Sequence, residues 1–407
     1  MGVAKIIIVW VSCLVIAFLT YRFCAAYIVA NTNVDASLQL WSGNSRALEN
    51  KQTRQLLSAV AIPNENHNLD YSQNILKAAP LSSAVFFNYA WFYSKRLDEQ
   101  RLRDVLEMAK LRNPRNQNVL KMLSQRTLQN GELDKAIENL HLLMVIAPDD
   151  QKEYYPLLDM LYNKEVASAA ILEKIHQNEI WVEKFILYQI RLAEKTNILG
   201  VLNSVNSYIL SEFVPEGKKK NIKEKYLMKT VRLGEIDIAY NLWKSWRRPS
   251  FVESTPFDPM FKDETALPPF NWSFNHGYNG IVVERNQIGG FFSSFSDTVP
   301  RKIISQIMFL EEKQISHISF DASWDYTARQ GYFEWRAYCS VSRKLIARLP
   351  INYKLNDKHS KTFPFPIDSE GCDYLTLELW GIPGVIPGRI VMTVNSVELT
   401  LERQSLP

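Results

Sequence analysis

The sequence predicts a multidomain α + β protein, with an N-terminal transmembrane helix, an α-solenoid of helical hairpins and a C-terminal antiparallel β-sandwich. Three observations predict this order. An apolar run opens the chain, prolines recur at a fixed interval through its middle, and apolar residues alternate with polar ones near its end. The expected boundaries are 1–30 for the anchor, 31–80 for leading helices, 81–250 for the helical repeats, 251–269 for a linker and 270–403 for the sandwich.

Composition limits the classes of function. The 407 residues carry a formal net charge of +4 with both signs interspersed, and 46% of them are hydrophobic, which is enough for real cores in two or three domains. The basic run Lys218–Lys225 would suit anionic lipid or glycan, but we interpret it as a solvated loop and helix start. No basic stripe with interleaved aromatic residues occurs, so we expect no binding of nucleic acid.

The first 30 residues indicate a membrane anchor. Ile6–Leu19 is an unbroken run of apolar or small residues, and a helix from Val3 to Ala26 would be roughly 36 Å long, enough to cross a bilayer. The alternative is a cleaved signal peptide with Cys24-Ala25-Ala26 as its cleavage site. We favour an uncleaved single-pass anchor in the inner (cytoplasmic) membrane, because the apolar stretch continues past Arg22. Lys5 slightly favours a cytoplasmic N-terminus, with the body in the periplasm.

Five prolines form a ladder along the middle of the chain. Pro80, Pro114 and Pro148 are 34 residues apart, as are Pro215 and Pro249, and the gap between the two sets is 67 residues, one short of two further periods. A 34-residue period is the length of one helix–turn–helix unit whose second helix is closed by a proline. The ladder therefore predicts stacked helical hairpins, with divergent repeats in phase between the two sets.

A second repeated motif supports this period. Gly131–Ala136 recurs as Gly234–Ala239, at an offset of 103 residues. Glycine fits a turn between two helices because it adopts positive φ at little cost, and the acidic residues suit the first turn of the next helix. Apolar residues follow helical spacing in the same region: Phe86, Tyr89, Ala90 and Tyr93; Leu102, Leu106 and Ala109; Leu120, Leu123 and Thr127; Ala136, Leu140 and Leu143.

These positions resemble the tetratricopeptide repeat, over residues 81–148 well and 222–249 moderately. Ala109 and Ala136 match its small positions, and Pro114 and Pro148 its closing proline. The resemblance implies a scaffold that binds a protein partner. An aromatic stripe surrounds Trp91 and Phe92; most of it is expected in the core between repeats, with Trp91 and Phe92 as candidates for a protein-binding groove.

From residue 270 the pattern has a period of two. This many short segments separated by turn residues indicates an antiparallel sandwich. The predicted strands are Trp272–Phe274, Gly280–Glu284, Gly290–Phe295, Ile303–Leu310, Ile315–Ser323, Tyr332–Val341, Lys344–Leu349, Thr362–Ile367, Tyr374–Trp380 and Ile390–Leu401.

The order of segments from Pro269–Trp272 through Gly289–Phe292 to the closing strand Gly388–Leu399 resembles the galactose-binding-like jelly roll of many carbohydrate-binding modules. The resemblance spans about 270–403 and implies binding of a glycan. Such modules often place an aspartate in the last strand, where this chain has Asn395, so a structural calcium ion is in doubt. The six histidines are scattered without metal-ligand spacing, and we expect no metal and no cofactor.

Alternation assigns side chains to the two faces of the strands. If Tyr332–Val341 and Tyr374–Trp380 are neighbours, one face carries polar and aromatic residues that suit a sugar, which stacks on flat rings and bonds to arginine and carboxylate groups. An equally favoured alternative is that these aromatic residues pack against the helical domain or the rim of the sandwich. The candidate glycan-binding residues are Arg336, Tyr338, Tyr374, Glu378 and Trp380.

The cysteines agree with an extracytoplasmic location. Cys339 and Cys372 lie 33 residues apart in the C-terminal region, and a disulfide between them would add roughly 3–4 kcal/mol in an oxidising compartment. The alternative is a pair of buried free thiols.

Together these features predict a non-enzymatic adaptor, and they resemble accessory factors of bacterial exopolysaccharide or cell-envelope assembly. A purely structural interaction scaffold is one alternative. An envelope glycosidase is another, since it needs two carboxylates at a set separation. Asp321, Asp325, Glu334 and Glu378 could in principle supply them, but carboxylates at strand ends are common, and we expect no turnover.

Overall fold

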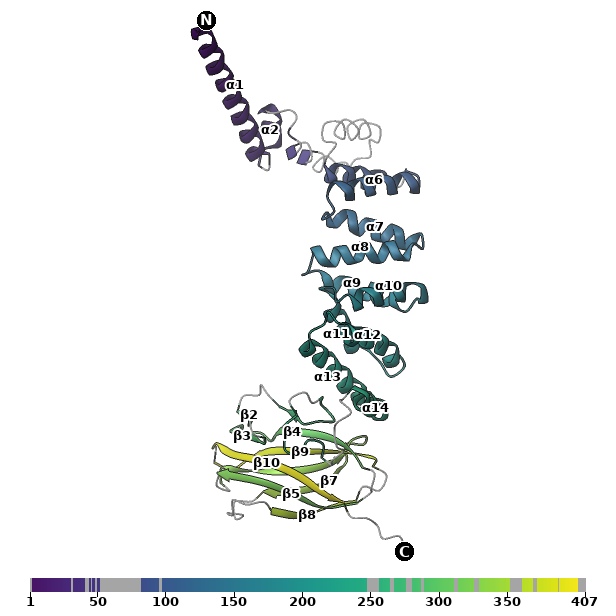
Figure 1. The fold of residues 1–407 in the computed structure, drawn as a ribbon, viewed down its shortest axis with the longest axis vertical. Coiled ribbons are helices and arrows are strands. Elements are labelled where there is room, and N and C mark those ends of the chain that lie inside the picture. Colours follow the sequence, from purple (N-terminus) through teal and green to yellow (C-terminus); the bar gives the residue numbers. More distant parts are fainter. Residues whose placement is uncertain are drawn as a thin grey trace. The chain divides into compact units, whose positions relative to one another are not determined.

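The structure, a computed structural model, describes residues 2–30, 32–40, 44, 46–47, 50–51, 82–94, 97–246, 256–263, 267–275, 280–286, 289–310, 314–325, 329–351, 361–368, 372–386 and 388–401. Helices occupy the N-terminal part and strands the C-terminal part (Figure 1). The chain divides into two compact units, residues 1–174 with 179–181, and residues 175–178 with 182–407.

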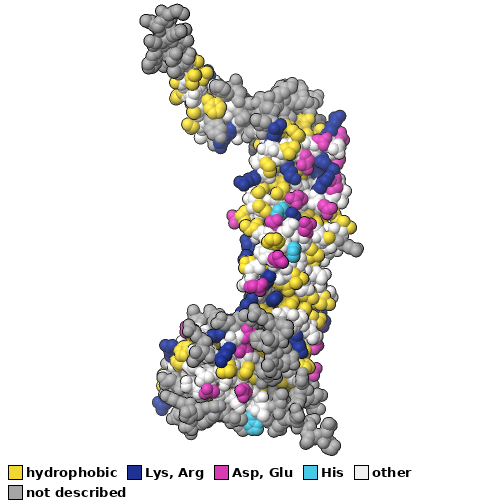
Figure 2. All heavy atoms as spheres, viewed as in Figure 1, with side chains coloured by type: hydrophobic (Ala, Val, Ile, Leu, Met, Phe, Trp, Pro, Cys, Tyr) yellow, Lys and Arg dark blue, Asp and Glu magenta, His cyan; other side chains and the backbone are white. Residues whose placement is uncertain are grey.

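A helix of 28 residues, α1 (Gly2–Val29), covers the predicted anchor. The side chains of its first half, residues 2–14, lie outside the described part. Beyond them, large apolar side chains of α1 such as Ile16 and Phe18 are more than half exposed (Figure 2). No helix in the described part of the chain is long and apolar enough to cross a membrane.

The helix α2 (Val34–Leu40) follows α1 and packs against its end. The Ser37 hydroxyl donates to the Ala26 carbonyl at 2.7 Å, and Ala30, Val34 and Ala47 form a small buried cluster. The remainder of the predicted leading helices, residues 52–81, lies outside the described residues.

Helical hairpins fill residues 83–246 in the interval that the prolines predict. The first helices of successive pairs begin at residues 83, 117, 151, 182 and 216, so the hairpins continue through the stretch where the ladder is interrupted. The helices are α5 (Ser83–Tyr93), α6 (Glu99–Arg112), α7 (Gln117–Gln129), α8 (Leu133–Ile146), α9 (Gln151–Tyr162), α10 (Glu165–His176), α11 (Val182–Leu192), α12 (Ile198–Leu210), α13 (Glu216–Arg232) and α14 (Ile236–Trp246).

The predicted apolar positions on α6, α7 and α8 are buried, with Leu102, Leu120 and Leu140 at most 1% exposed. Pro114 and Pro148 lie in the turns that follow α6 and α8, and Pro215 is the residue before α13. Pro80 and Pro249 fall outside the described residues. The prolines therefore mark turns between pairs, where a missing backbone N–H breaks no helical hydrogen bond.

The two glycines of the repeated motif have the predicted left-handed conformation. Gly131 has φ of 75° and Gly234 has φ of 85°. In both turns the next amide reaches back over the glycine: the Glu132 N–H donates to the Thr127 carbonyl at 2.8 Å, and the Glu235 N–H donates to the Thr230 carbonyl at 3.1 Å. This is the hydrogen bond that ends a helix at a left-handed glycine.

Replacing Gly131 by Ala is expected to destabilise the first unit by about 1–2 kcal/mol, the cost of a left-handed conformation for an L-residue. No atom lies within 4 Å of the added methyl group, so the cost is purely conformational. Urea unfolding followed by circular dichroism measures it. Gly200→Ala is the matched control: that site is equally open but lies in α12 with ordinary φ, and Ala should raise stability by up to about 1 kcal/mol. Equal effects at both glycines would contradict the assignment.

A buried histidine couples the first unit to pH. His141 on α8 accepts a hydrogen bond at Nδ1 from the Trp181 indole N–H at 3.1 Å. Burial lowers the pKa of His141; the nearby Glu179 and Glu138 carboxylates oppose this shift, while Lys174 adds to it. The neutral imidazole therefore belongs to the folded state, because a proton on Nδ1 would break the bond to Trp181.

Stability from His141 is complete above the ordinary histidine pKa of about 6.5 and is lost as the pH falls below it, since the unfolded state then binds more protons. The midpoint of thermal unfolding should fall between pH 7.5 and pH 5. In His141→Gln, which keeps an acceptor for Trp181 but cannot titrate, the fall should be shallower. A slope identical to that of the parent would exclude His141 as a source of the pH dependence.

Ten strands form two antiparallel sheets, and each predicted strand is confirmed to within a few residues. One sheet has the order β1-β4-β9-β6-β7 and the other β2-β3-β10-β5-β8. The strands are β1 (Ser273–Phe274), β2 (Ile281–Arg285), β3 (Phe291–Phe295), β4 (Arg301–Phe309), β5 (Gln314–Asp325), β6 (Gly331–Cys339), β7 (Leu345–Ile351), β8 (Lys361–Asp368), β9 (Tyr374–Pro383) and β10 (Ile390–Leu401).

Both sheets contribute to one apolar core. Trp335 and Leu377 from the first sheet and Phe291 and Met392 from the second belong to the same buried cluster, and each is fully buried. The first and last of the strands β3–β10 pair with each other, as do the second and last but one. This winding of the chain between two sheets is that of a jelly roll.

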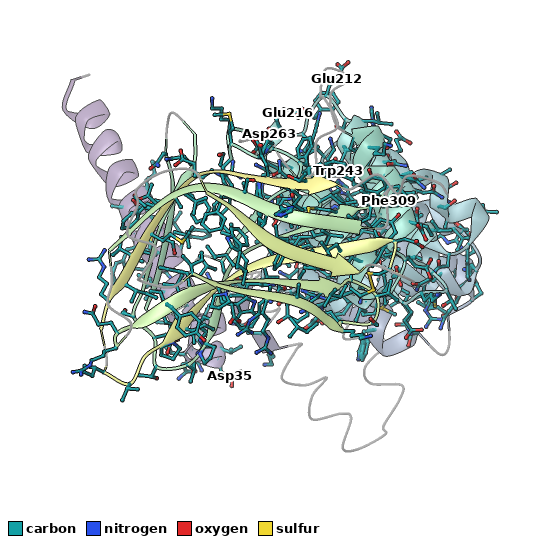
Figure 3. All side chains as sticks on the ribbon, turned by 90° about the horizontal axis from the view of Figure 1, so that it is seen from below. Asp35, Glu212, Glu216, Trp243, Asp263 and Phe309 are labelled. Atoms are coloured by element: carbon teal, nitrogen blue, oxygen red, sulfur yellow. A yellow bond between two sulfur atoms is a disulfide. The ribbon has the colours of Figure 1, made fainter. Side chains whose placement is uncertain are left out.

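Within the second unit, helix α14 packs on one end of the β4–β9 pair. Trp243 is 4% exposed, and its ring lies 5.0 Å from Phe257 and 5.7 Å from Phe270 between centroids. Tyr240 contacts the rings of Phe270 and Phe309, and Figure 3 labels Trp243 and Phe309 at this junction. The described part of the predicted linker is therefore ordered, since it contributes Phe257 to this cluster.

Candidate functional site

The outward face of the first sheet contains the predicted glycan-binding residues. Strands β6 and β9 are neighbours, as the interpretation of this face requires. Residues opposite one another on adjacent strands form rows across the sheet. One row consists of Ser305, Glu378, Arg336 and Arg348, and the next consists of Lys302, Trp380, Glu334 and Pro350.

The carboxylate of Glu378 is enclosed by polar partners. Its side chain is 0% exposed. Oε2 accepts a hydrogen bond from the Trp380 indole N–H at 2.8 Å, while Oε1 lies 3.4 Å from Lys302 Nζ and 3.6 Å from a guanidinium nitrogen of Arg343. A buried carboxylate is tolerated only when it is paired and hydrogen-bonded in this way. Glu378 therefore acts as the internal counter-charge of the face.

Arg336 covers one face of the Trp380 ring. Its guanidinium carbon lies 4.4 Å from the ring centroid, within the range of a cation–π contact, and its Nε donates to the Glu334 carboxylate. Burial by itself would lower the pKa of Arg336, but the hydrogen bonds to Glu334 and Tyr338 outweigh it, and the net shift is upward. Arg336 is thus a fixed cation, and the indole face beneath it is not open for sugar stacking.

Tyr338 is arranged in the same manner. Its side chain is half-buried, and the guanidinium of Arg343 lies 5.4 Å from its ring centroid. Arg343 belongs to the turn between β6 and β7, where its own amide donates to the Cys339 carbonyl at 2.8 Å. The turn thereby folds a cation back over the sheet.

Tyr374 departs from the prediction, because it does not lie on the open part of this face. It is 5% exposed, and its hydroxyl donates to the Asp237 carboxylate on α14 at 2.7 Å. Burial, together with the hydrogen bond to Asp237, raises the pKa of Tyr374. Its ring also contacts Tyr240 and Phe309. At this end of the sheet the packing is against the helices, which is the alternative that the sequence left open.

The face also includes residues that sequence reasoning missed: Lys302, Arg343, Arg348 and Glu334. Alternation already placed Glu334 beside Arg336, so that signal was available. The positions of Lys302 and Arg348 depend on which strands flank β9 and β6, and the alternation of residues does not encode strand order.

A disulfide joins the two strands that carry the face. Cys339 ends β6, Cys372 precedes β9, and their Cα atoms are 5.7 Å apart. Beside it the Ser340 N–H donates to the Tyr374 carbonyl at 2.8 Å. The disulfide therefore fixes the end of the sheet where the Arg343 turn and the α14 contact meet.

The remaining candidates lie elsewhere. Trp91 on α5 is 63% exposed, with the Phe87 ring 6.2 Å away, whereas the side chain of Phe92 lies outside the described part. Asp321 is on β5 of the other sheet and accepts from Asn395 at 3.0 Å, and the side chain of Asp325 is not described. Among the described residues, no three His, Cys, Asp or Glu side chains are grouped to hold a metal ion.

No protein-family model and no curated protein matches the sequence. Among solved structures, the chain is similar to TmCBM61 in complex with β-1,4-galactotriose, with 12% identity and a TM-score of 0.25 over 37% of this chain and 100% of that chain. It is also similar to a structure of accessory secretory proteins 1, 2 and 3 of Streptococcus pneumoniae, with 10% identity and a TM-score of 0.20 over 31% of this chain and 87% of that chain.

Proposed function

We propose that this chain is a non-enzymatic, membrane-anchored adaptor whose helical hairpins bind a protein partner and whose sandwich binds a glycan, in polysaccharide or cell-envelope assembly. The observation that carries the proposal is the open part of the sheet face, where exposed cations surround Trp380 and Tyr338. Arginine forks and partly exposed aromatic side chains are the groups that orient sugars in protein sites.

Two further features support the adaptor architecture. The apolar run Ile6–Leu19 coincides with a continuous helix, which supports a single-pass anchor in the inner membrane with the body in the periplasm. The 34-residue interval, the left-handed glycines and the buried small residues support hairpins of the tetratricopeptide type. Hairpins of this type stack into extended binding surfaces, and the exposed Trp91 offers a contact for a protein partner.

The absence of catalysis is part of the same proposal. A glycosidase needs one carboxylate that can donate a proton and a second that faces the sugar. Here the Glu378 oxygens are committed to Trp380, Lys302 and Arg343, and Glu334 is bound to Arg336. Neither carboxylate is placed for that chemistry.

A second candidate is a purely structural scaffold that binds no glycan. It is favoured by Tyr374, which joins the face to α14, and by the guanidinium groups that lie over Trp380 and Tyr338. In that case the charged cluster would serve to hold the sheet and the helices in one unit.

The test compares the full chain, purified in mild detergent, with Arg336→Ala and Trp380→Ala on an array of polysaccharides. We expect the parent to bind a subset of the array and each variant to lose at least about tenfold in affinity, roughly 1.4 kcal/mol. Trp91→Ala removes an exposed tryptophan far from the sheet in sequence and serves as the control. A parent that binds nothing, or variants that bind like the parent, would favour the structural scaffold.

A further inference from the structure

The open face of the sheet has an uneven distribution of charge between its interior and its surface. Four cations and two carboxylates lie on it, so its formal charge is 4 − 2 = +2. The cations are Lys302, Arg336, Arg343 and Arg348, and the carboxylates are Glu334 and Glu378.

Burial separates these charges by sign. The side chains of Glu378 and Glu334 are 0% and 7% exposed, whereas those of Arg343 and Lys302 are 60% and 36% exposed. A ligand that approaches the face therefore meets cations, while the carboxylates lie beneath them. The effective surface charge is more positive than the formal sum.

Arg348 adds an unengaged cation to this surface. It lies on the edge strand β7, directly opposite Arg336, and is exposed. No ion pair to Arg348 is present among the described residues. Two arginines on adjacent strands would repel each other in the absence of an anion, so their placement favours a negatively charged ligand between them.

The same groups are poorly suited to a neutral sugar. Neutral sugars require open aromatic faces for stacking and free acceptors for their hydroxyl groups. Here Arg336 lies over one face of the Trp380 ring at 4.4 Å and Arg343 lies near the Tyr338 ring at 5.4 Å. The Glu378 oxygens already accept from Trp380 and face Lys302 and Arg343. What remains free is a set of charged donors.

We infer that this face binds an acidic glycan, a polysaccharide that carries carboxylate groups of the uronic acid type. The inference rests on the proposed glycan-binding function and names its ligand class. Guanidinium groups form paired hydrogen bonds with carboxylates. The cations lie on β4, β6 and β7, with β9 between the first two, and therefore span about 14 Å at 4.8 Å per strand. That span suits an extended polyanion with several regularly spaced charges.

The experiment measures the affinity of the full chain in mild detergent for polygalacturonate, for the same polymer after chemical reduction of its carboxyl groups, and for a neutral β-1,4-galactan. We expect binding to polygalacturonate only, with a loss of at least about tenfold between 50 and 300 mM salt because the contacts are ionic. Arg348→Gln and Arg348→Glu should reduce the affinity about fivefold and more than tenfold. Both variants should fold normally, since this side chain is exposed.

Arg329→Gln is the matched control, because Arg329 is an exposed arginine of the sandwich in the loop before β6 and should leave binding unchanged. Equal, salt-insensitive binding of all three polymers would overturn the inference while the glycan-binding function stands. Binding of polygalacturonate that ignores Arg348→Glu would also overturn it. Binding of no polysaccharide would end both proposals. Vesicles with a fifth of phosphatidylserine test the remaining source of anions, and binding to them alone would replace the glycan by a membrane.

Discussion

Replacing Trp243 by Ala is expected to lower the free energy of unfolding of the second unit by about 3–5 kcal/mol, the range for removing a buried tryptophan. Trp243 joins α14 to Phe257 and Phe270 in a cluster that also contains Ile307 and Tyr374 of the sheet. Its loss leaves a cavity that the β-strands on one side and the helix on the other cannot readily close. Urea unfolding followed by tryptophan fluorescence and circular dichroism measures the change.

Trp91→Ala is the control for this variant, because a tryptophan that is 63% exposed should contribute within about 0.5 kcal/mol. Hydrogen exchange gives a second readout. In Trp243→Ala the amides of α14 should exchange faster, while those of β10, which pairs on both sides, should stay protected. A loss below about 1 kcal/mol together with unchanged exchange in α14 would mean that the helix does not pack on the sheet in solution.

Removing the disulfide is expected to have the second largest effect. Replacing both Cys339 and Cys372 by Ala should cost roughly 3–4 kcal/mol, because the crosslink closes a loop of 33 residues and restricts the unfolded chain. Thermal unfolding with and without reductant should show the same decrease in the parent and no effect of reductant in the double variant. Cys24→Ser, at an exposed free cysteine, should change neither curve. Two thiols that alkylate freely in the native protein would refute the crosslink.

The sequence was sufficient for the elements and insufficient for their partners. Local periodicity predicted the strands and the repeated helices, because the alternation of Leu375, Leu377 and Leu379 and the spacing of Leu102 and Leu106 are written in neighbouring residues. The two glycine turns were predicted for the same reason: a left-handed residue is a local requirement.

The composition of the candidate site depended on contacts between distant residues. Tyr374 and Trp380 lie on the same face of β9, six residues apart, yet one is buried against α14 and the other lies on the open part of the sheet. Nothing in the alternation of β9 distinguishes them, because the difference arises from Tyr240 and Asp237 more than 130 residues earlier. Lys302 entered the site for a similar reason, since it is brought to Glu378 by a pairing of strands across 76 residues.

The contact between α14 and the sheet has a consequence for the length of the helical array. A stack of hairpins needs a terminal unit with a polar outer surface, since otherwise the last apolar face would recruit further hairpins or aggregate. Here the outer side of α14 carries Tyr240 and Trp243, and the sheet supplies what a terminal hairpin would. The sandwich is thus the end-piece that sets the number of hairpins. A chain cut after residue 246 would present an adhesive helix, and its tendency to self-associate is a direct gauge of that role.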